Sequence, residues 1–129
     1  MLREPLLAAA RSPRLRRVAE RSRLTRPVVN RFVAGANQAD ALRVTGELVG
    51  AGLRVSLDFL GEDTTSIEQA RHTVAAYRSA LAALGEAGLA AHAEVSVKLS
   101  AIGQSLPDGN AIALDGARQI CAAAAAAGT

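Results

Sequence analysis

Two short stretches of the chain alternate between apolar and polar residues and predict β-strands. In the first, over 53–58, Leu, Val and Leu alternate with Arg, Ser and Asp. In the second, over 93–99, Ala, Val, Val and Leu alternate with Glu, Ser and Lys. Because successive side chains of a strand point to opposite faces, each strand should have one apolar face and one polar face.

Apolar residues at helical spacing predict helices before, between and after these strands. Asn37 is a favourable N-cap for the first helix. Thr64, Thr65 and Ser66 are candidate N-caps for the second, and Thr65 followed by Glu68 is typical of a capping box. We expect the three helices over about 37–50, 65–88 and 110–128.

The order of these elements indicates an α/β fold. Two strands joined by a long helix form a right-handed crossover and should be parallel. Parallel sheets need more than two strands and cover on both faces, and a polar second face suits the interior of a barrel. We therefore expect the amino-terminal part of a (β/α)₈ (TIM-like) barrel: a segment of short helices over 1–36, then the first βα units over 37–129.

Positive charge is concentrated at the start of the chain, where residues 1–31 hold nine arginines and two glutamates. Such a segment is compatible with nucleic-acid binding, with an organellar presequence or with a solvated helical face. No aromatic residue lies among the arginines before Phe32, which weakens stacking on bases. We favour a solvated face, or a surface that docks on other parts of the protein or on an anionic membrane, and expect no nucleic-acid partner. No apolar run is long enough to span a membrane.

Cysteine and histidine give little indication of chemistry. Cys121 is the single cysteine, which excludes an internal disulfide and fits a reducing, cytoplasmic compartment. It precedes six alanines, and we interpret it as a small buried hydrophobic residue. His72 and His92 have no companion at metal-ligand spacing, so we expect both on the surface and no metal site.

Candidate chemistry lies at the carboxyl ends of the two strands. Lys98 is the single lysine in a chain with fourteen arginines, which favours a need for a compact ammonium there. Lys98 and Asp58 would share the polar face at the end of a barrel where active sites are built. Removing two such charged side chains from water is costly, so each should either form an ion pair or serve in binding or catalysis. They are candidate catalytic residues that anchor an anionic substrate group; the alternative is an ion pair that only stabilises the barrel. Glu62, on the following loop, is either a gate contact or a solvated acid.

Two motifs in this order resemble the amino-terminal part of the proline dehydrogenase family: Asp58–Glu62 and Val95–Ala101. Arg26–Val29 and Arg31–Gly35 resemble the segment before the barrel in its actinobacterial, single-activity members. The resemblance implies a distorted (β/α)₈ barrel that holds FAD and oxidises L-proline to 1-pyrroline-5-carboxylate by hydride transfer. It also implies a membrane quinone as electron acceptor, 1-pyrroline-5-carboxylate dehydrogenase as pathway partner, and a location in the cytoplasm or at the inner face of the membrane.

The same resemblance assigns roles to three residues. Lys98 would lie near the flavin and bind the proline carboxylate, Asp58 would line the same pocket, and Glu62 would pair with a distant arginine to close it. Most flavin contacts and two carboxylate-binding arginines would lie beyond residue 129. We therefore expect an amino-terminal fragment that is inactive alone. The alternatives are another (β/α)₈ enzyme that forms a Schiff base on Lys98, a nucleic-acid-binding protein that uses the basic segment, and an inactive remnant.

Overall fold

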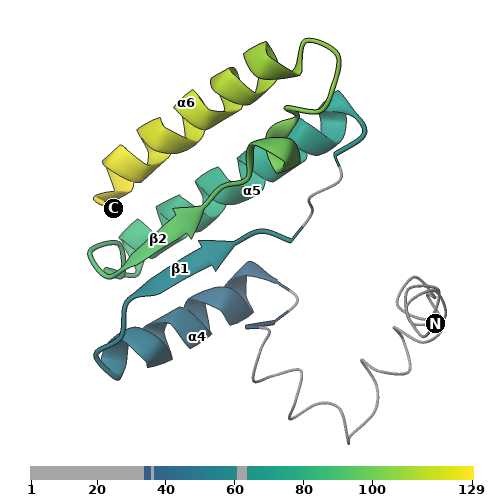
Figure 1. The fold of residues 1–129 in the computed structure, drawn as a ribbon. Helices are drawn as coiled ribbons and strands as arrows, with labels where there is room; N and C mark the ends of the chain where they lie inside the picture. The colour runs from purple at the N-terminus through teal and green to yellow at the C-terminus, as the bar shows by residue number, and fades with distance from the viewer. Residues whose placement is uncertain (1–33, 36, 61–63) are drawn as a thin grey trace, which may run out of the picture. The chain divides into compact units, whose positions relative to one another are not determined.

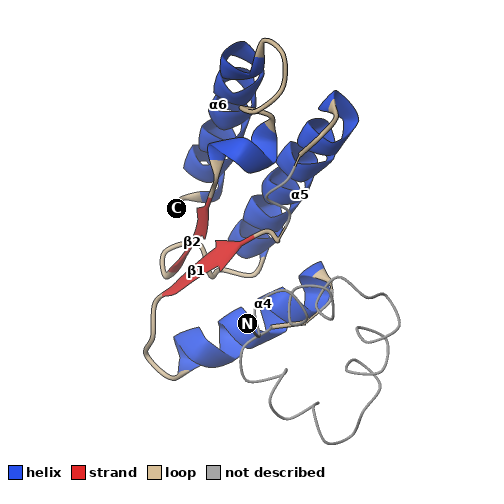
Figure 2. Ribbon diagram, turned by 45° about the vertical axis from the view of Figure 1, so that its right-hand side comes forward, coloured by secondary structure: helices blue, strands red, loops and turns tan. Residues whose placement is uncertain are grey.

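The computed structural model describes residues 34–35, 37–60 and 64–129. Residues 42–129 form one compact unit, which contains both strands. The expected helical segment over 1–36 lies outside the described residues, apart from Ala34 and Gly35. The elements are α4 (Gln38–Gly50), β1 (Val55–Asp58), α5 (Ile67–Glu86), β2 (Ala93–Ser96), the 3₁₀ helix η1 (Leu99–Ile102) and α6 (Gly109–Ala127) (Figures 1 and 2).

The two strands pair in parallel, with Val55 opposite Ala93 and Asp58 opposite Ser96. The predicted parallel order is thus confirmed, but both strands are shorter than expected. β2 stops at Ser96 because β1, its partner, ends at the residue opposite. Lys98 keeps an extended backbone beyond this point, with φ −91° and ψ 126°, before η1 begins. At the other end, the N–H of Leu53 bonds to the carbonyl of Leu48 and closes the turn after α4 instead of joining the sheet.

Helix α5 is capped by Ser66, the last of its three predicted N-cap candidates. Ser66 is the N-cap, and its hydroxyl accepts a hydrogen bond from the backbone N–H of Gln69 at 3.3 Å. The Gln69 side chain in turn accepts from the N–H of Thr65 at 2.8 Å. The predicted capping box from Thr65 to Glu68 is therefore wrong. The prediction of Ser66 as an N-cap is confirmed, because this residue lies directly before the first turn of the helix.

The core lies between α5, α6, η1 and the apolar side of the second strand region. Its buried residues are Val74, Tyr77, Leu81, Ile102, Ala113 and Ile120. Val95 and Val97 of the second strand region pack against this cluster. The helices approach closely because Gly116 has no side chain: a Cβ there would lie 2.9 Å from Cγ2 of Val74. Burial of these side chains stabilises the unit by roughly 1.5–3 kcal/mol for each large one.

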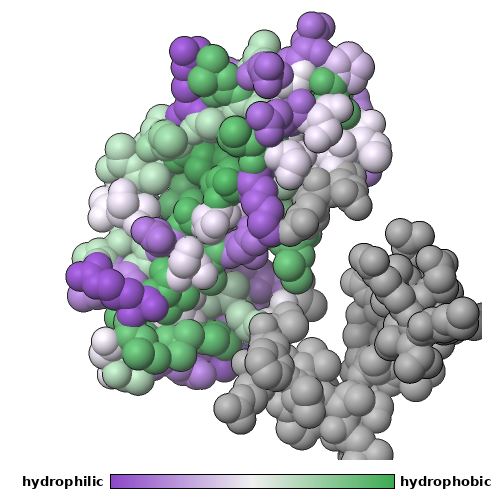
Figure 3. All heavy atoms as spheres, viewed as in Figure 1, coloured by the Kyte–Doolittle hydropathy of each residue, from purple (hydrophilic) through white to green (hydrophobic). Residues whose placement is uncertain are grey.

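The sheet has the two different faces that the alternation predicts. Val55, Leu57 and Val95 are half-buried, whereas Asp58 and Ser96 are exposed. In Figure 3, hydrophobic and hydrophilic side chains lie next to each other on the face that is drawn. Large exposed apolar residues include Leu53, Leu60, Leu99 and Leu114.

Helix α6 corrects one expectation and its end confirms another. Cys121 is exposed, not buried. α6 turns Ile120 into the core, so the next residue is rotated by about 100° toward solvent. The helix ends as predicted at Gly128, whose φ of 84° is readily adopted by glycine. The hydroxyl of Thr129 then donates to the carbonyl of Ala93 at 2.7 Å, which ties the end of α6 to the start of β2.

Both histidines lie at the surface. His72 and His92 are exposed, as predicted.

Across 34–35, 37–60 and 64–129, no helix is both long enough and apolar enough to cross a membrane.

Candidate functional site

The structure brings Lys98 and Asp58 together. Asp58 is the last residue of β1, opposite Ser96, and Lys98 follows two residues later on the same face as Ser96. The Lys98 ammonium Nζ lies 3.1 Å from Oδ2 of Asp58. Parity along the two parallel strands is the cause, because residues two apart lie on one face and the carboxyl ends meet at one edge.

This ion pair is accessible to solvent. The side chain of Lys98 is 44% exposed and that of Asp58 is 34% exposed. An ion pair with this exposure contributes about 0–1 kcal/mol to stability, since water screens it. Stability alone therefore gives little reason for the pair, and the ammonium can be reached by an anionic ligand.

A third residue completes the arrangement. The hydroxyl of Tyr77, on α5, faces two acceptors that share its single proton, Oδ1 of Asp58 at 3.1 Å and the carbonyl of Ser96 at 2.8 Å. It also accepts a hydrogen bond from the backbone N–H of Phe59 at 3.2 Å. The ring is 2% exposed, so the phenol joins the hydrophobic core to the ends of both strands. Asp58 is thus held on Oδ1 by Tyr77 and on Oδ2 by Lys98.

The sequence pattern did not indicate Tyr77 as a residue of the candidate site. One signal could have indicated it. Tyr77 is the single tyrosine of the chain, on a helix face that is otherwise aliphatic. A tyrosine buried in this way normally finds a hydrogen-bond partner for its hydroxyl. Which partner it finds depends on the packing of α5 against the sheet, and the sequence alone does not define that.

The environment of Tyr77 favours the protonated form of its hydroxyl. Burial is the main cause that raises the pKa of Tyr77 above its ordinary value of 10.0. The hydrogen bond and the negative charge of Asp58 raise the pKa further, whereas the N–H of Phe59 and the charge of Lys98 oppose the shift. The neutral phenol therefore remains a hydrogen-bond donor to the carboxylate over the physiological range.

Apolar residues follow both charged residues in the chain. Phe59 comes directly after Asp58, and its ring makes edge-to-face contacts with Tyr77, at 6.1 Å between centroids, and with His72, at 6.3 Å. Leu60 is 78% exposed, and Leu99, directly after Lys98, is 46% exposed. The polar centre is therefore combined with apolar side chains at the carboxyl ends of the strands.

Two further expectations concern the gate and metals. Glu62 lies outside the described residues, so its role as a gate stays a prediction. Within the described part of the chain, no group of three or more histidine, cysteine, aspartate or glutamate residues could hold a metal ion.

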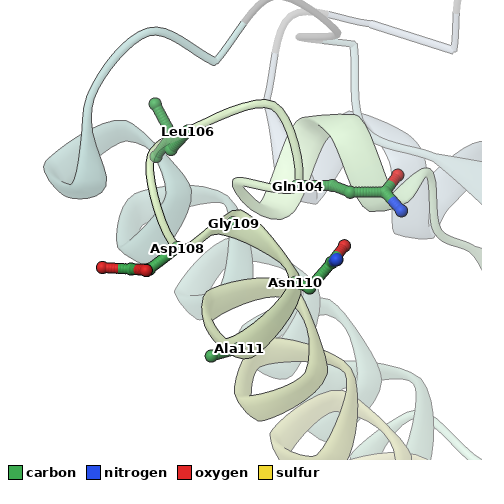
Figure 4. Close-up of a pocket in the computed structure, with 6 residues that line it drawn as sticks. All are labelled: Gln104, Leu106, Asp108, Gly109, Asn110 and Ala111. Atoms are coloured by element: carbon green, nitrogen blue, oxygen red, sulfur yellow. The ribbon is translucent and has the colours of Figure 1, made fainter.

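A depression at the start of α6 is separate from the ion pair. Its lining residues are Gln104, Leu106, Asp108, Gly109, Asn110 and Ala111. The side chain of Asp108 points in a different direction from those of Gln104 and Asn110 (Figure 4). The lining includes no residue that the sequence indicated as functional, and its polar groups do not converge. We therefore place the candidate site at Lys98, Asp58 and Tyr77.

Comparison with known proteins gives a partial similarity. No protein-family model matches the chain. Over 84 residues the chain is 33% identical to proline dehydrogenase 1 of Bacillus subtilis (strain 168). The match covers 65% of this chain and 27% of the relative, so the chain spans about a quarter of the relative's length. This similarity supports a suspected relationship to proline dehydrogenases, and the resemblance to single-activity members stays a prediction.

Proposed function

We propose that this chain forms part of an enzyme that oxidises L-proline to 1-pyrroline-5-carboxylate, with Lys98 binding the substrate carboxylate. One observation carries the proposal: a solvent-accessible ammonium lies 3.1 Å from Asp58 at the carboxyl ends of two parallel strands. Sites of (β/α)₈ enzymes are built at this end of the strands. The similarity to a proline dehydrogenase supports the choice of substrate.

The charges of the pair match those of a free amino acid. A zwitterion such as proline carries a carboxylate and an ammonium group that are attached to the same carbon atom. Its carboxylate would bind the Lys98 ammonium, and its positive amine would be attracted to the Asp58 carboxylate. A lysine acts as a point charge and gives no bidentate grip, so other cationic groups must complete the binding of the carboxylate.

We propose the same larger fold that the sequence predicts. The exposed polar face of β1 and β2 would line the interior of a (β/α)₈ barrel, and α5 and α6 would belong to its outer ring. The half-buried Val95 and Val97 of the second strand region pack on the core that these helices form, as such a barrel requires. Because the chain spans about a quarter of its relative, we propose that the remaining strands of the active enzyme are supplied by further sequence.

FAD is the electron acceptor that we propose for this reaction, with a membrane quinone as the next acceptor and 1-pyrroline-5-carboxylate dehydrogenase as the enzyme that uses the product. The described residues do not fit a tightly held flavin, because the polar sheet face and the Lys98–Asp58 pair are open to solvent. The 129-residue chain, purified with FAD added, should therefore retain less than one flavin per chain. Stoichiometric flavin would contradict this.

The test of the proposed function is proline-dependent reduction of an artificial electron acceptor. It uses the protein made from its complete reading frame, with FAD added. The proposal predicts activity with L-proline and little with L-prolinamide, which lacks the carboxylate that Lys98 would bind. No activity with L-proline, or equal activity with both compounds, would overturn it.

A further inference from the structure

The phenol of Tyr77 has more partners than a buried tyrosine needs. Its hydroxyl carries one proton but faces two acceptors, Oδ1 of Asp58 at 3.1 Å and the carbonyl of Ser96 at 2.8 Å. Its lone pair accepts from the N–H of Phe59. The Ser96 and Phe59 contacts alone would satisfy the hydroxyl. The contact with Asp58 therefore adds a link between the core and a charged residue of the candidate site.

Asp58 uses its two oxygens for different partners. Oδ1 faces the Tyr77 hydroxyl and Oδ2 faces the Lys98 ammonium. A carboxylate bound only to an exposed lysine can rotate, and its direction is weakly defined because both side chains are mobile in water. With Oδ1 held by a side chain from the buried core, the direction of Oδ2 is defined as well, and so is the position of the ammonium.

We propose that Tyr77 is a positioning residue of this site: its hydroxyl holds Asp58 by Oδ1 so that Oδ2 holds the Lys98 ammonium at the carboxyl ends of the strands. This inference rests on the proposed function for its role in substrate binding, although the contacts themselves do not depend on it. Tyr77 acts through Asp58 and contacts no substrate.

The same geometry explains how Asp58 stays satisfied when a ligand binds. An anionic group that approaches Lys98 draws the ammonium away from the carboxylate. The single proton of Tyr77 lies within reach of Asp58 and of the Ser96 carbonyl, and the more exposed negative charge on Asp58 then attracts it. Tyr77 therefore limits the free energy lost when Lys98 turns from Asp58 to the ligand.

A spectroscopic titration tests the link without substrate. Tyr77 is the single tyrosine and the chain has no tryptophan, so ultraviolet absorbance of tyrosinate reports this phenol alone. The charged groups that face the hydroxyl among the described residues are Asp58 and Lys98. The Asp58→Asn variant should lower the titration midpoint, and Lys98→Met should raise it. Glu94→Gln, on the same face of β2 but without contact to Tyr77, should leave it unchanged.

Circular dichroism at each pH shows whether the chain is still folded when the phenol titrates. A midpoint that moves in neither the Asp58→Asn nor the Lys98→Met variant of the folded chain would overturn the link. If alkali unfolds the chain first, the near-ultraviolet spectrum of Tyr77 at neutral pH replaces the titration. It should differ between Asp58→Asn and Glu94→Gln, and identical spectra would overturn the link.

A kinetic measurement tests the positioning role in the complete protein. Tyr77→Phe should raise the KM for L-proline about three- to tenfold, the size of one ordinary net hydrogen bond, because Tyr77 acts on the substrate only through Asp58 and Lys98, with a smaller change in kcat. Leu84→Met, a conservative core change on the same helix, should leave KM unchanged. An unchanged KM in Tyr77→Phe would overturn the positioning role. A protein that never oxidises proline would overturn the proposed function, while the titration would still decide the link.

Discussion

The ammonium of Lys98 lies 3.1 Å from the carboxylate of Asp58, although the whole of helix α5 separates the two residues in the chain. Parallel pairing of β1 and β2 creates this contact, because it places both carboxyl ends at one edge of the sheet (Figure 1). The contact is half open to solvent, and it is anchored to the core by the phenol of Tyr77.

Removal of the Tyr77 hydroxyl should destabilise the chain. In Tyr77→Phe the N–H of Phe59 and the carbonyl of Ser96 lose their partner, and because both hydrogen bonds are only partly buried, the loss should cost about 0.5–1.5 kcal/mol. Urea denaturation followed by circular dichroism measures the free energy of unfolding. The matched control is Ala75→Ser, at an exposed position of the same helix, which should change it by about 0.5 kcal/mol or less. Equal stability of Tyr77→Phe and the wild type would contradict the hydrogen-bond network.

Stability should fall at alkaline pH because of Tyr77. Burial raises the pKa of this phenol in the folded chain above the ordinary value of 10.0 that it regains on unfolding. As the pH rises, the unfolded state therefore loses the proton first and binds fewer protons than the folded state. The stabilising contribution of the protonated phenol is complete below pH 10.0. It is lost as the pH rises through the raised pKa of Tyr77 in the folded chain. Free energies of unfolding of the wild type should decline more steeply above pH 10.0 than those of Tyr77→Phe; parallel curves would refute the shift.

Two glycines offer a matched test of the helix packing. Gly116 of α6 lies against Val74, where a new Cβ would be 2.9 Å from Cγ2, whereas a Cβ at Gly46 of α4 would meet nothing closer than 4.0 Å. Alanine favours a helix over glycine by about 1 kcal/mol. Gly46→Ala should therefore raise the free energy of unfolding by up to that amount. Gly116→Ala should give no gain or a loss, which Val74→Ala in the same chain should partly relieve. A similar gain at both sites would show that the helices are not in close contact.

Much of the fold was predictable from the two alternating strands. Alternation defined which face of each strand is apolar, and the long helix between them required a parallel crossover. The strand ends were not predictable, because they depend on where the partner strand stops: β2 ends at Ser96 since β1 ends at Asp58. The orientation of Cys121 was also missed. A run of alanines has no polar residues to indicate which side of the helix faces solvent.

The candidate site was predictable in part. Lys98 and Asp58 could be placed together by counting along each strand, since parity is a local property. The contact between Asp58 and Tyr77 depends on how far α5 lies from the sheet, which is a property of the packed core. From the sequence, the Tyr77 hydroxyl among aliphatic residues indicates only that it has some hydrogen-bond partner, and does not indicate which one.

The alternative chemistry on Lys98 predicts a covalent adduct. A Schiff base needs a free amine that can attack a carbonyl compound, whereas this ammonium is paired with Asp58. Incubation with pyruvate and borohydride should give no mass increase on Lys98, and the Lys98→Arg variant controls for labelling of the chain's terminal amine. Because Lys98 is the single lysine, the adduct can be located without ambiguity. A trapped adduct on Lys98 would favour an aldolase-type enzyme over proline oxidation.

The proposed function requires that the Lys98 ammonium binds the carboxylate of proline. The most direct test is the KM for L-proline of Lys98→Ala in the protein made from its complete reading frame. The matched control is Arg118→Ala, which removes an exposed cation from α6. Loss of a charge-assisted contact of about 1.5–3 kcal/mol corresponds to a rise in KM of roughly ten- to a hundredfold. We predict such a rise for Lys98→Ala with the stability of the fold little changed, and no rise for Arg118→Ala. An unchanged KM in Lys98→Ala would contradict the account.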